Sequence, residues 1–394
     1  MSNLERVEAT LRAVDAPAPD SDHKPDHPPQ LEASSWKYAL KRTVREFGTD
    51  GGADLAAMLT FFSVLSLAPA LLAVFSLITL VLASNAETVT SLVDDLVRQY
   101  VPTEYQSLVV MLVETMISSS SGGVVALIIG IAIAVWSSSA YVKAFSRSMN
   151  IIYGREEGRG LIKRTAAMLG TTLAILVGAV LILVCLALND ALVTGVLGPI
   201  AGPLGLGELL GFMTESFLPV WAWAKWPIIL VLVIAIVALL YYFTPNVRQP
   251  RFTWVSLGSV VAIIGIAIAG AGLYLYSSYF AGYNPYGAIG TVMALLLALW
   301  VSNIVLLLGA EVDAEVERAR QLQAGMPAER HIQLPPWDTA KVETMKTIQT
   351  RLESQGRALR MAHREHPTAD RSTSSDRSAP IDPNNRGHGP SRTG

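Results

Sequence analysis

The 17 residues PIILVLVIAIVALLYYF, at positions 227–243, contain no charged side chain. A helix needs about 20 consecutive apolar residues, with a lower limit of about 17, to cross the hydrocarbon core of a bilayer. The surface helix of a soluble protein would interrupt such a stretch with polar residues at a period of about 3.6. The stretch therefore predicts a transmembrane helix.

Five further apolar segments lie on either side of this one. Only 16% of the residues of the chain are charged and 51% are hydrophobic, whereas a soluble domain carries about 25% charged residues. The predicted fold class is therefore all-α, a polytopic membrane bundle of six transmembrane helices. The expected spans are residues 53–83, 123–144, 165–188, 227–243, 254–276 and 288–310.

The positions of Lys and Arg orient this bundle. Of the 30 basic residues, 28 fall in the two tails and in the 143–164 and 244–253 connections, and only Arg98 and Lys225 fall on the opposite side. Cytoplasmic connections carry the excess of basic residues in membrane proteins. We therefore expect both termini in the cytoplasm.

Two longer connections on the outer side have patterns of their own. Apolar residues recur at helical spacing in residues 87–117, which predicts amphipathic extracytoplasmic helices. Residues 195–226 are rich in Gly and Pro and end in a tryptophan cluster, Trp221, Trp223 and Trp226, that suits the membrane interface. Either a surface hairpin or a re-entrant segment fits this composition.

The composition also divides the chain into four parts. Residues 1–35 lack an apolar run and are rich in Pro, Asp and Ala, so we expect a disordered cytoplasmic N-terminal tail. Residues 36–320 form the membrane domain. Residues 321–364 are expected to be cytoplasmic and partly helical, and residues 365–394 to form a disordered C-terminal tail.

The sequence supplies no converging set of catalytic groups. All six histidines lie in the tails, the single cysteine, Cys185, lies in an apolar run, and C-x-x-C, H-E-x-x-H, phosphate-loop and nucleophile-elbow motifs are absent. Metal-assisted hydrolysis needs imidazole and carboxylate ligands that converge on one point. We therefore expect neither catalysis nor a metal or cofactor.

Polar residues in or beside the spans are the functional candidates, because their burial away from water must be compensated. Asp54 and Glu311 mark the cytoplasmic ends of the first and sixth spans. Two placements stay open. Glu311 faces a cavity and holds a basic residue of the 143–164 connection, or these carboxyls, with Asp313, lie in the headgroup layer beside nearby cations. Those cations are Lys41, Arg42 and Arg318.

Other candidates lie deeper in the bundle. Pro69 predicts a kink in the first span, where Ser63 and Ser66 are placed to bind the freed carbonyls. The kink either lines a cavity or serves packing alone. Asn303, the amide deep in the sixth span, either links helices or belongs to a polar path. Ser138, which lies in a serine run suited to close packing, Lys143 and Asn150 complete the candidates for lining or gating a cavity.

Two further features belong to the last two spans. The glycines of the fifth span, Gly258, Gly265, Gly270 and Gly272, predict a tightly packed helix. A turn at the outer end of the sixth span is flanked by tyrosines that either anchor the helix at the interface or bind a sugar or lipid headgroup. The outer-face candidates are Tyr283, Asn284, Tyr286 and Gly287.

Three stretches together resemble the YihY/BrkB family of bacterial inner-membrane proteins, which is also labelled ribonuclease BN. They are DGGADLAAMLTFFSVLSLAPA (50–70), WSSSAYVKAFSRSMNIIYG (136–154), and NPYGAIG with LLLGAEVDAE (284–315). The resemblance covers about residues 36–320. It implies six spans in the inner membrane, no settled activity, and a link to the movement of lipid or lipopolysaccharide precursors.

These observations favour the transport or translocation of a lipid-like or amphiphilic envelope substrate, with membrane lipids as partners. The alternative is a non-transporting scaffold that docks an extracytoplasmic envelope protein. A ribonuclease is disfavoured, because the catalytic set is missing and the basic cytoplasmic face already follows from membrane topology. We therefore expect no nucleic-acid partner.

Overall fold

All the regular structure of the described residues is helical in the computed structural model. These residues are 3–19, 24–25, 30–81, 123–189, 207–250, 256–280 and 288–365, together with 193 and a few positions between 97 and 111. Two compact units are present, Met1–Val342 and Glu343–Gly394.

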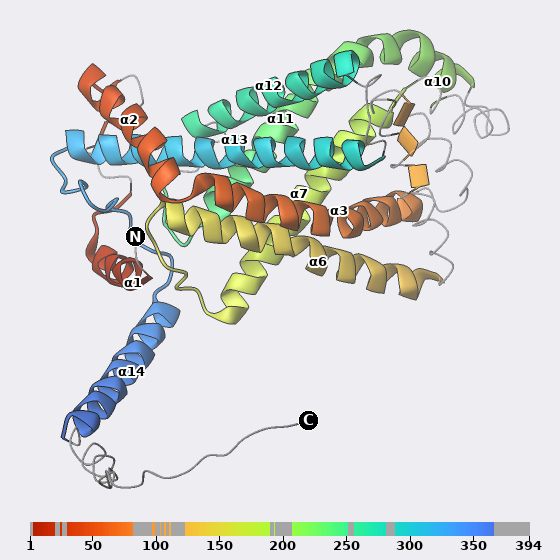
Figure 1. Ribbon diagram of the computed structural model, residues 1–394. Coiled ribbons are helices and arrows are strands. Elements are labelled where there is room, and N and C mark those ends of the chain that lie inside the picture. Colours follow the sequence, from red (N-terminus) through yellow and green to blue (C-terminus); the bar gives the residue numbers. More distant parts are fainter. Residues whose placement is uncertain are drawn as a thin grey trace, which may run out of the picture. The chain divides into compact units, whose positions relative to one another are not determined.

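The helices of the first unit account for the apolar segments of the sequence (Figure 1). In chain order they are α1 (Asn3–Arg12), η1 (Ala13–Asp15), α2 (Ala33–Thr49), α3 (Gly52–Val81), α6 (Gly123–Ile152), α7 (Leu161–Ala187), α10 (Gly207–Phe212), η4 (Met213–Phe217), α11 (Leu218–Phe243), α12 (Leu257–Phe280) and α13 (Ala288–Gln323). The second unit holds most of α14 (Ala340–Glu365).

Four helical segments of the described residues are long and apolar enough to cross a membrane. They are Leu161–Ala187, Leu210–Phe243, Leu257–Leu275 and Val292–Gln323. A bent pair, α2 and the first part of α3, meets at 63° and makes a fifth if it forms one broken span. Each of the six expected spans falls largely within a helix. The count of six and the orientation of the termini stay predictions.

The fourth apolar segment differs most from its expected bounds. Pro227, expected at its start, lies inside α11, and the unbroken helical segment of α10, η4 and α11 begins at Gly207. The tryptophan part of residues 195–226 therefore belongs to this helix, and Trp221 donates a hydrogen bond from Nε1 to the Cys185 carbonyl of α7 at 3.3 Å. Proline is tolerated within membrane helices, because neighbouring groups can bind the freed carbonyl. The glycine-rich residues 194–206 lie outside the described residues.

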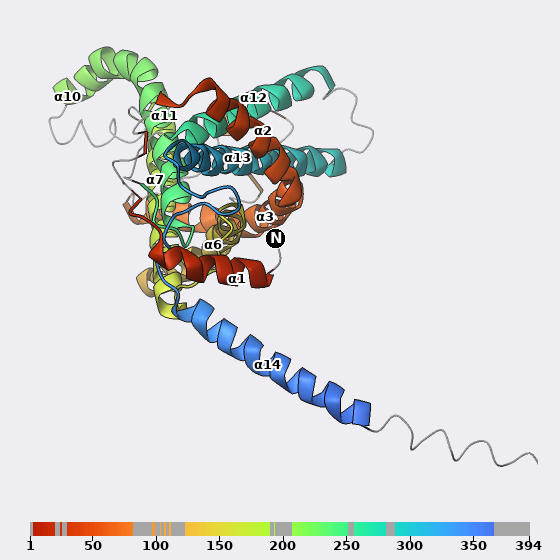
Figure 2. The ribbon, with the colours of Figure 1, turned by 90° about the vertical axis from the view of Figure 1, so that its left-hand side faces the viewer.

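Helix α13 is the centre of the packing. It packs against α12, α2, α3 and α6, while α3 packs against α6 and α11 against α7. Figures 1 and 2 both show α12 beside α13 and α11 beside α7.

Glycines allow α12 to approach α13 closely. A Cβ atom on Gly258 would meet the backbone oxygen of Gly309, and one on Gly265 would meet the Val305 side chain. The expected tight packing of the fifth span is therefore confirmed over this half of α12. Gly270 and Gly272 have no neighbour within 4 Å of an added Cβ among the described atoms, so the close contact does not continue to them.

The turn between α2 and α3 requires a glycine. Gly51 has φ +70°, a conformation that residues with a Cβ rarely adopt. The chain direction changes there, so the amphipathic α2 leads into the apolar α3 at a steep angle. This turn places the first part of α3 against the core of the bundle, where Leu59 is fully buried with Phe145 of α6 and Leu307 of α13.

The N-terminal segment differs from the disordered tail that composition predicts. Residues 3–12 form α1, whose Val7 and Ala9 are buried, and Leu31 packs in a small core with Val316 of α13. Lys24 Nζ lies 2.9 Å from Glu317 Oε1 in a buried ion pair. The segment has too few apolar residues to form a core alone, but the extension of α13 to Gln323 supplies a surface for it. Residues 366–394 of the expected C-terminal tail lie outside the described residues.

Candidate functional site

A row of hydroxyl groups runs along one face of α3. Thr60, Ser63 and Ser66 recur at intervals of three residues, which keeps them on one side of a helix. The Asn303 amide of α13 donates to Thr60 Oγ1 at 3.2 Å and to Ser63 Oγ at 3.4 Å. Its oxygen accepts a hydrogen bond from the Tyr141 hydroxyl of α6 at 3.0 Å. Asn303, 3% exposed, thus links three helices.

The serines continue this polar row toward the other end of α3. Ser66 Oγ donates to the Ser138 carbonyl of α6 at 3.5 Å. The Ser138 hydroxyl itself is buried and has no hydrogen-bond partner among the described residues. Lys143, one turn further along α6, places its ammonium 4.6 Å from the centre of the Trp136 ring. Pro69 lies within α3, and its side chain lies outside the described part.

Glu311 is the unusual carboxyl of the bundle. Its side chain is 1% exposed, and neither carboxylate oxygen has a hydrogen-bond partner among the described residues. It lies in α13, where that helix packs against α2 and α3. Burial of an unpaired carboxyl is costly, and a membrane protein retains one chiefly where it serves a function.

The cations expected beside Glu311 bind another carboxyl instead. Arg42 Nε lies 3.0 Å from Glu315 Oε2, and Arg318 Nε lies 2.9 Å from the same atom. Glu315 is one turn beyond Glu311, so the expected pairing is displaced by one turn along α13. Asp313 Oδ1 accepts a hydrogen bond from the Gly258 backbone at 2.7 Å. Asp54 is exposed in the first turn of α3.

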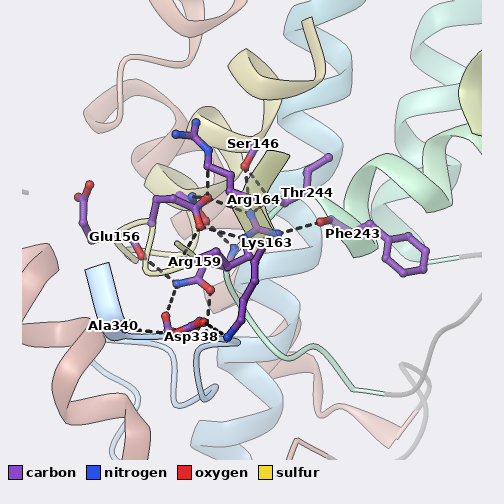
Figure 3. Close-up of polar contacts among 12 residues, drawn as sticks. Ser146, Glu156, Arg159, Lys163, Arg164, Phe243, Thr244, Asp338 and Ala340 are labelled. Carbon is purple, nitrogen blue, oxygen red and sulfur yellow. Dashed lines mark hydrogen bonds and ion pairs between the residues drawn. The ribbon is translucent and has the colours of Figure 1, made fainter. Parts of the chain in front are cut away.

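A second polar cluster lies in the connection between α6 and α7 (Figure 3). Arg159 binds Glu157 through two contacts, Nε to Oε1 at 2.8 Å and Nη2 to Oε2 at 2.9 Å. Arg159 Nη2 also donates to the Thr244 carbonyl at the end of α11 at 2.7 Å. Burial alone would raise the pKa of Glu157, but the hydrogen bonds and charge of Arg159 and the charge of Arg164 lower it. The carboxylate is therefore held in its charged form.

Two asparagines extend this cluster. Asn150, at the end of α6, donates to Glu157 Oε2 at 3.3 Å and accepts from the Asn246 backbone at 2.7 Å. Asn246 Nδ2 donates to the Asp338 carbonyl at 2.9 Å, and a Cβ on Gly158 would clash with that same carbonyl. The cluster thus joins the ends of α6 and α11 to the segment before α14. Of the sequence candidates, only Asn150 belongs to it.

Glu157, Arg159 and Asn246 were not among the residues predicted from the sequence. A signal was present, because residues 154–160 read GREEGRG and place four charges in seven residues between two long apolar segments. The basic residues of this connection were explained only by its expected position on the cytoplasmic side of the membrane. The outer-face candidates Tyr283, Asn284, Tyr286 and Gly287 lie outside the described residues. Within the described residues, no group of three or more His, Cys, Asp or Glu side chains is placed to hold a metal ion.

Comparison with known proteins places the chain in a family. Residues 43–332 match the family described as virulence factor BrkB. The chain belongs to this family. The match covers the apolar helices, the Asn303 cluster and the second polar cluster apart from Asp338. With the long apolar helices, it makes this BrkB family member a multi-pass membrane protein.

Two curated proteins are similar to this chain over most of its length. A ribonuclease-like protein of Bacillus subtilis, YfkH, is 29% identical over 284 residues, which cover 72% of this chain and 96% of the relative. A UPF0761 membrane protein of Ralstonia nicotianae is 28% identical over 297 residues, 74% of this chain and 60% of the relative. No solved structure matches the chain.

Proposed function

We propose that this BrkB family member transports or translocates a lipid-like or amphiphilic substrate in the bacterial inner membrane, with both termini in the cytoplasm. The observation that carries the proposal is Glu311, a buried carboxyl without a hydrogen-bond partner among the described residues. Ionisable groups within membrane segments mark ion and substrate pathways. In the proposed cycle Glu311 exchanges a proton or binds a cationic group as the substrate passes.

The hydroxyl row of α3 supports the same proposal. Thr60, Ser63 and Ser66 present hydroxyls toward α13 and α6 along one side of the bundle. A polar row of this kind gives the headgroup of an amphiphile a series of hydrogen-bonding partners while its acyl chains stay in the lipid. Asn303 closes the row in the described conformation, so we propose that its hydrogen bonds open during passage.

The experiment is a transbilayer movement assay. The purified chain is reconstituted in liposomes of phosphatidylethanolamine and phosphatidylglycerol that carry a trace of fluorescent phospholipid, and a membrane-impermeant quencher reports the outer leaflet. We expect the wild-type protein to accelerate the exchange of the probe between leaflets. Glu311→Gln, which keeps the side-chain shape and removes the ionisable group, should slow the exchange.

The matched control is Glu353→Gln, the same substitution at an exposed position of α14. It should behave as wild type. Equal exchange in protein-free and wild-type liposomes would contradict transport of this lipid and favour the scaffold. Equal exchange in wild type and Glu311→Gln would remove Glu311 from the proposed pathway.

We also propose that the chain does not cleave RNA, although a relative is called ribonuclease-like. The proposal rests on the placement of all six histidines in the tails and on the explanation of the basic face by topology. Detergent-solubilised protein is incubated with labelled RNA in the presence of Mg²⁺, Mn²⁺ or Zn²⁺. Cleavage that co-purifies with the wild-type protein through two columns would overturn it.

A further inference from the structure

The first unit also contains a pocket that lies outside the membrane-spanning segments. This pocket of about 520 Å³ opens between α1 with η1, the connection after α6, and the segment 327–333. Its volume falls in the range of about 300–1,000 Å³ that is usual for small-molecule sites. The lining residues are Ala9, Arg12, Ala13, Arg155, Pro327, Glu329, Arg330, His331 and Gln333.

The charge of this lining is positive. The lining contains three guanidinium groups, those of Arg12, Arg155 and Arg330, and one carboxyl, that of Glu329. Arg12 has a partner, Glu8, at 3.2 Å, but that pair is exposed and therefore weak. The pKa of His331 is lowered by burial and by the charges of Arg155, Arg318, Arg12 and Arg330. Burial is the larger cause, and the arginine charges act in the same direction.

Arg155 is the residue that indicates a ligand. It is 2% exposed, and its terminal nitrogens donate to the backbone carbonyls of Ala9, Ile332 and Leu334. No carboxylate among the described residues pairs with it, and its Nε has no partner. Burial, with the charge of Arg318, lowers its pKa to about 10, which still leaves the group charged at neutral pH. Buried charges in proteins are normally paired.

We propose that this pocket binds a phosphate group, carried either by a soluble small molecule or by a phospholipid headgroup. The terminal nitrogens of Arg155 stay on the three backbone carbonyls, so a bound phosphate would supply the counter-charge that Arg155 lacks without replacing those hydrogen bonds. The exposed guanidinium groups of Arg12 and Arg330 supply the N–H groups, since arginine binds phosphate oxygens through two parallel N–H groups. Arg12 and Arg330 lie on the more exposed side of the pocket and bind the outer oxygens. The ligand thereby bridges α1, the α6–α7 connection and the segment after α13. The inference does not depend on transport.

The test measures binding to the full chain in nanodiscs of phosphatidylcholine. Inorganic pyrophosphate is titrated by calorimetry, first alone and then with discs that also contain phosphatidylglycerol. We expect saturable binding of pyrophosphate, weakened about tenfold by Arg330→Gln and by Arg12→Gln, because each substitution removes a charge-assisted hydrogen bond to the phosphate. Both side chains are exposed enough for the variants to fold. The matched control is Arg351→Gln, at an exposed position of α14, which should bind as wild type.

The outcomes separate the two sources. Pyrophosphate binding that is unchanged in phosphatidylglycerol discs supports a soluble ligand, and competition by phosphatidylglycerol supports a lipid headgroup. Wild-type protein without saturable pyrophosphate binding in either disc would overturn the proposal. An equal loss of affinity in Arg351→Gln would also overturn it, because the binding would then follow net charge alone.

Discussion

A single amide in the bundle core, Asn303, is expected to contribute measurably to stability. Its substitution by Leu removes the hydrogen bonds to Tyr141, Thr60 and Ser63 and leaves the Tyr141 hydroxyl without its acceptor. Such interhelical bonds contribute about 0.6–2 kcal/mol in membrane proteins. We therefore expect Asn303→Leu to destabilise the protein by about 1 kcal/mol, measured by unfolding in mixed micelles.

The matched control for this prediction is the neighbouring hydroxyl of Ser302. Its Oγ donates to the Ala298 carbonyl of its own helix at 2.8 Å and makes no hydrogen bond to another helix among the described residues. Ser302→Ala should therefore change stability by less than about 0.5 kcal/mol. Equal effects of the two substitutions would show that Asn303 does not act as an interhelical link.

The ion pair of Glu157 gives the stability of the α6–α7 connection a pH dependence. The pKa of Glu157 is lowered in the folded protein, so its contribution is present above the unfolded value of about 4.3 and is lost as pH falls through the folded value. At neutral pH, Glu157→Gln should destabilise the protein by about 3 kcal/mol, because it leaves Arg159 buried without a counter-ion. Melting temperatures measured from about pH 7 down to about pH 3 should show this difference shrinking.

An exposed pair serves as the control for the pH experiment. Glu8, which lies at the surface of α1 beside Arg12, has no such burial. Glu8→Gln should run parallel to wild type over the whole range. If Glu157→Gln and wild type also ran parallel, the buried pair would not be the group that titrates.

At the scale of elements, the close crossing of α12 and α13 depends on two glycines of α12, Gly258 and Gly265. Gly258→Ala would place a methyl group against the Gly309 backbone and the Asp313 carboxyl, and backbone cannot move aside as a flexible side chain can. We expect a loss of about 1–3 kcal/mol. Gly270→Ala on the same helix meets nothing within 4 Å of the described atoms and should raise stability by about 0.5–1 kcal/mol. Thermal unfolding in detergent measures both, and a loss at Gly270 as large as at Gly258 would contradict the close crossing.

Helices could be predicted from the sequence where a single apolar run was enough to specify them. An apolar run such as residues 228–243 specifies a helix without reference to any other part of the chain, and α11 contains it. The true start of that segment was not predictable, because Pro227 is compatible with either a first turn or a membrane-helix interior. Helix α1 was missed for a different reason. Its contacts are with Arg155 and Glu156 of the α6–α7 connection, which lie far away in sequence.

The residues of the candidate site could also be predicted only in part. Asn303 could be identified from sequence, since a lone amide in an apolar helix must find partners. Its particular partners, Tyr141 and Thr60, follow only from the packing of three helices. The two arginines beside Glu315 could not be assigned, because carboxyls at 311, 313 and 315 lie within two turns of one another and the packing of α2 decides which is reached.

At the scale of the whole molecule, the orientation in the membrane follows from charge and can be tested without any assay of function. The test uses single cysteines in a Cys185→Ser background. Ser107 and Ser354 are both exposed, the first in the connection expected outside and the second on α14, expected in the cytoplasm. With 28 of 30 basic residues on one side, we expect an impermeant maleimide added to intact cells to label Ser107→Cys and not Ser354→Cys. Both should be labelled after permeabilisation. Labelling of Ser354→Cys in intact cells would reverse the orientation and place the phosphate pocket, whose lining comes from the tails and the α6–α7 connection, on the outer side.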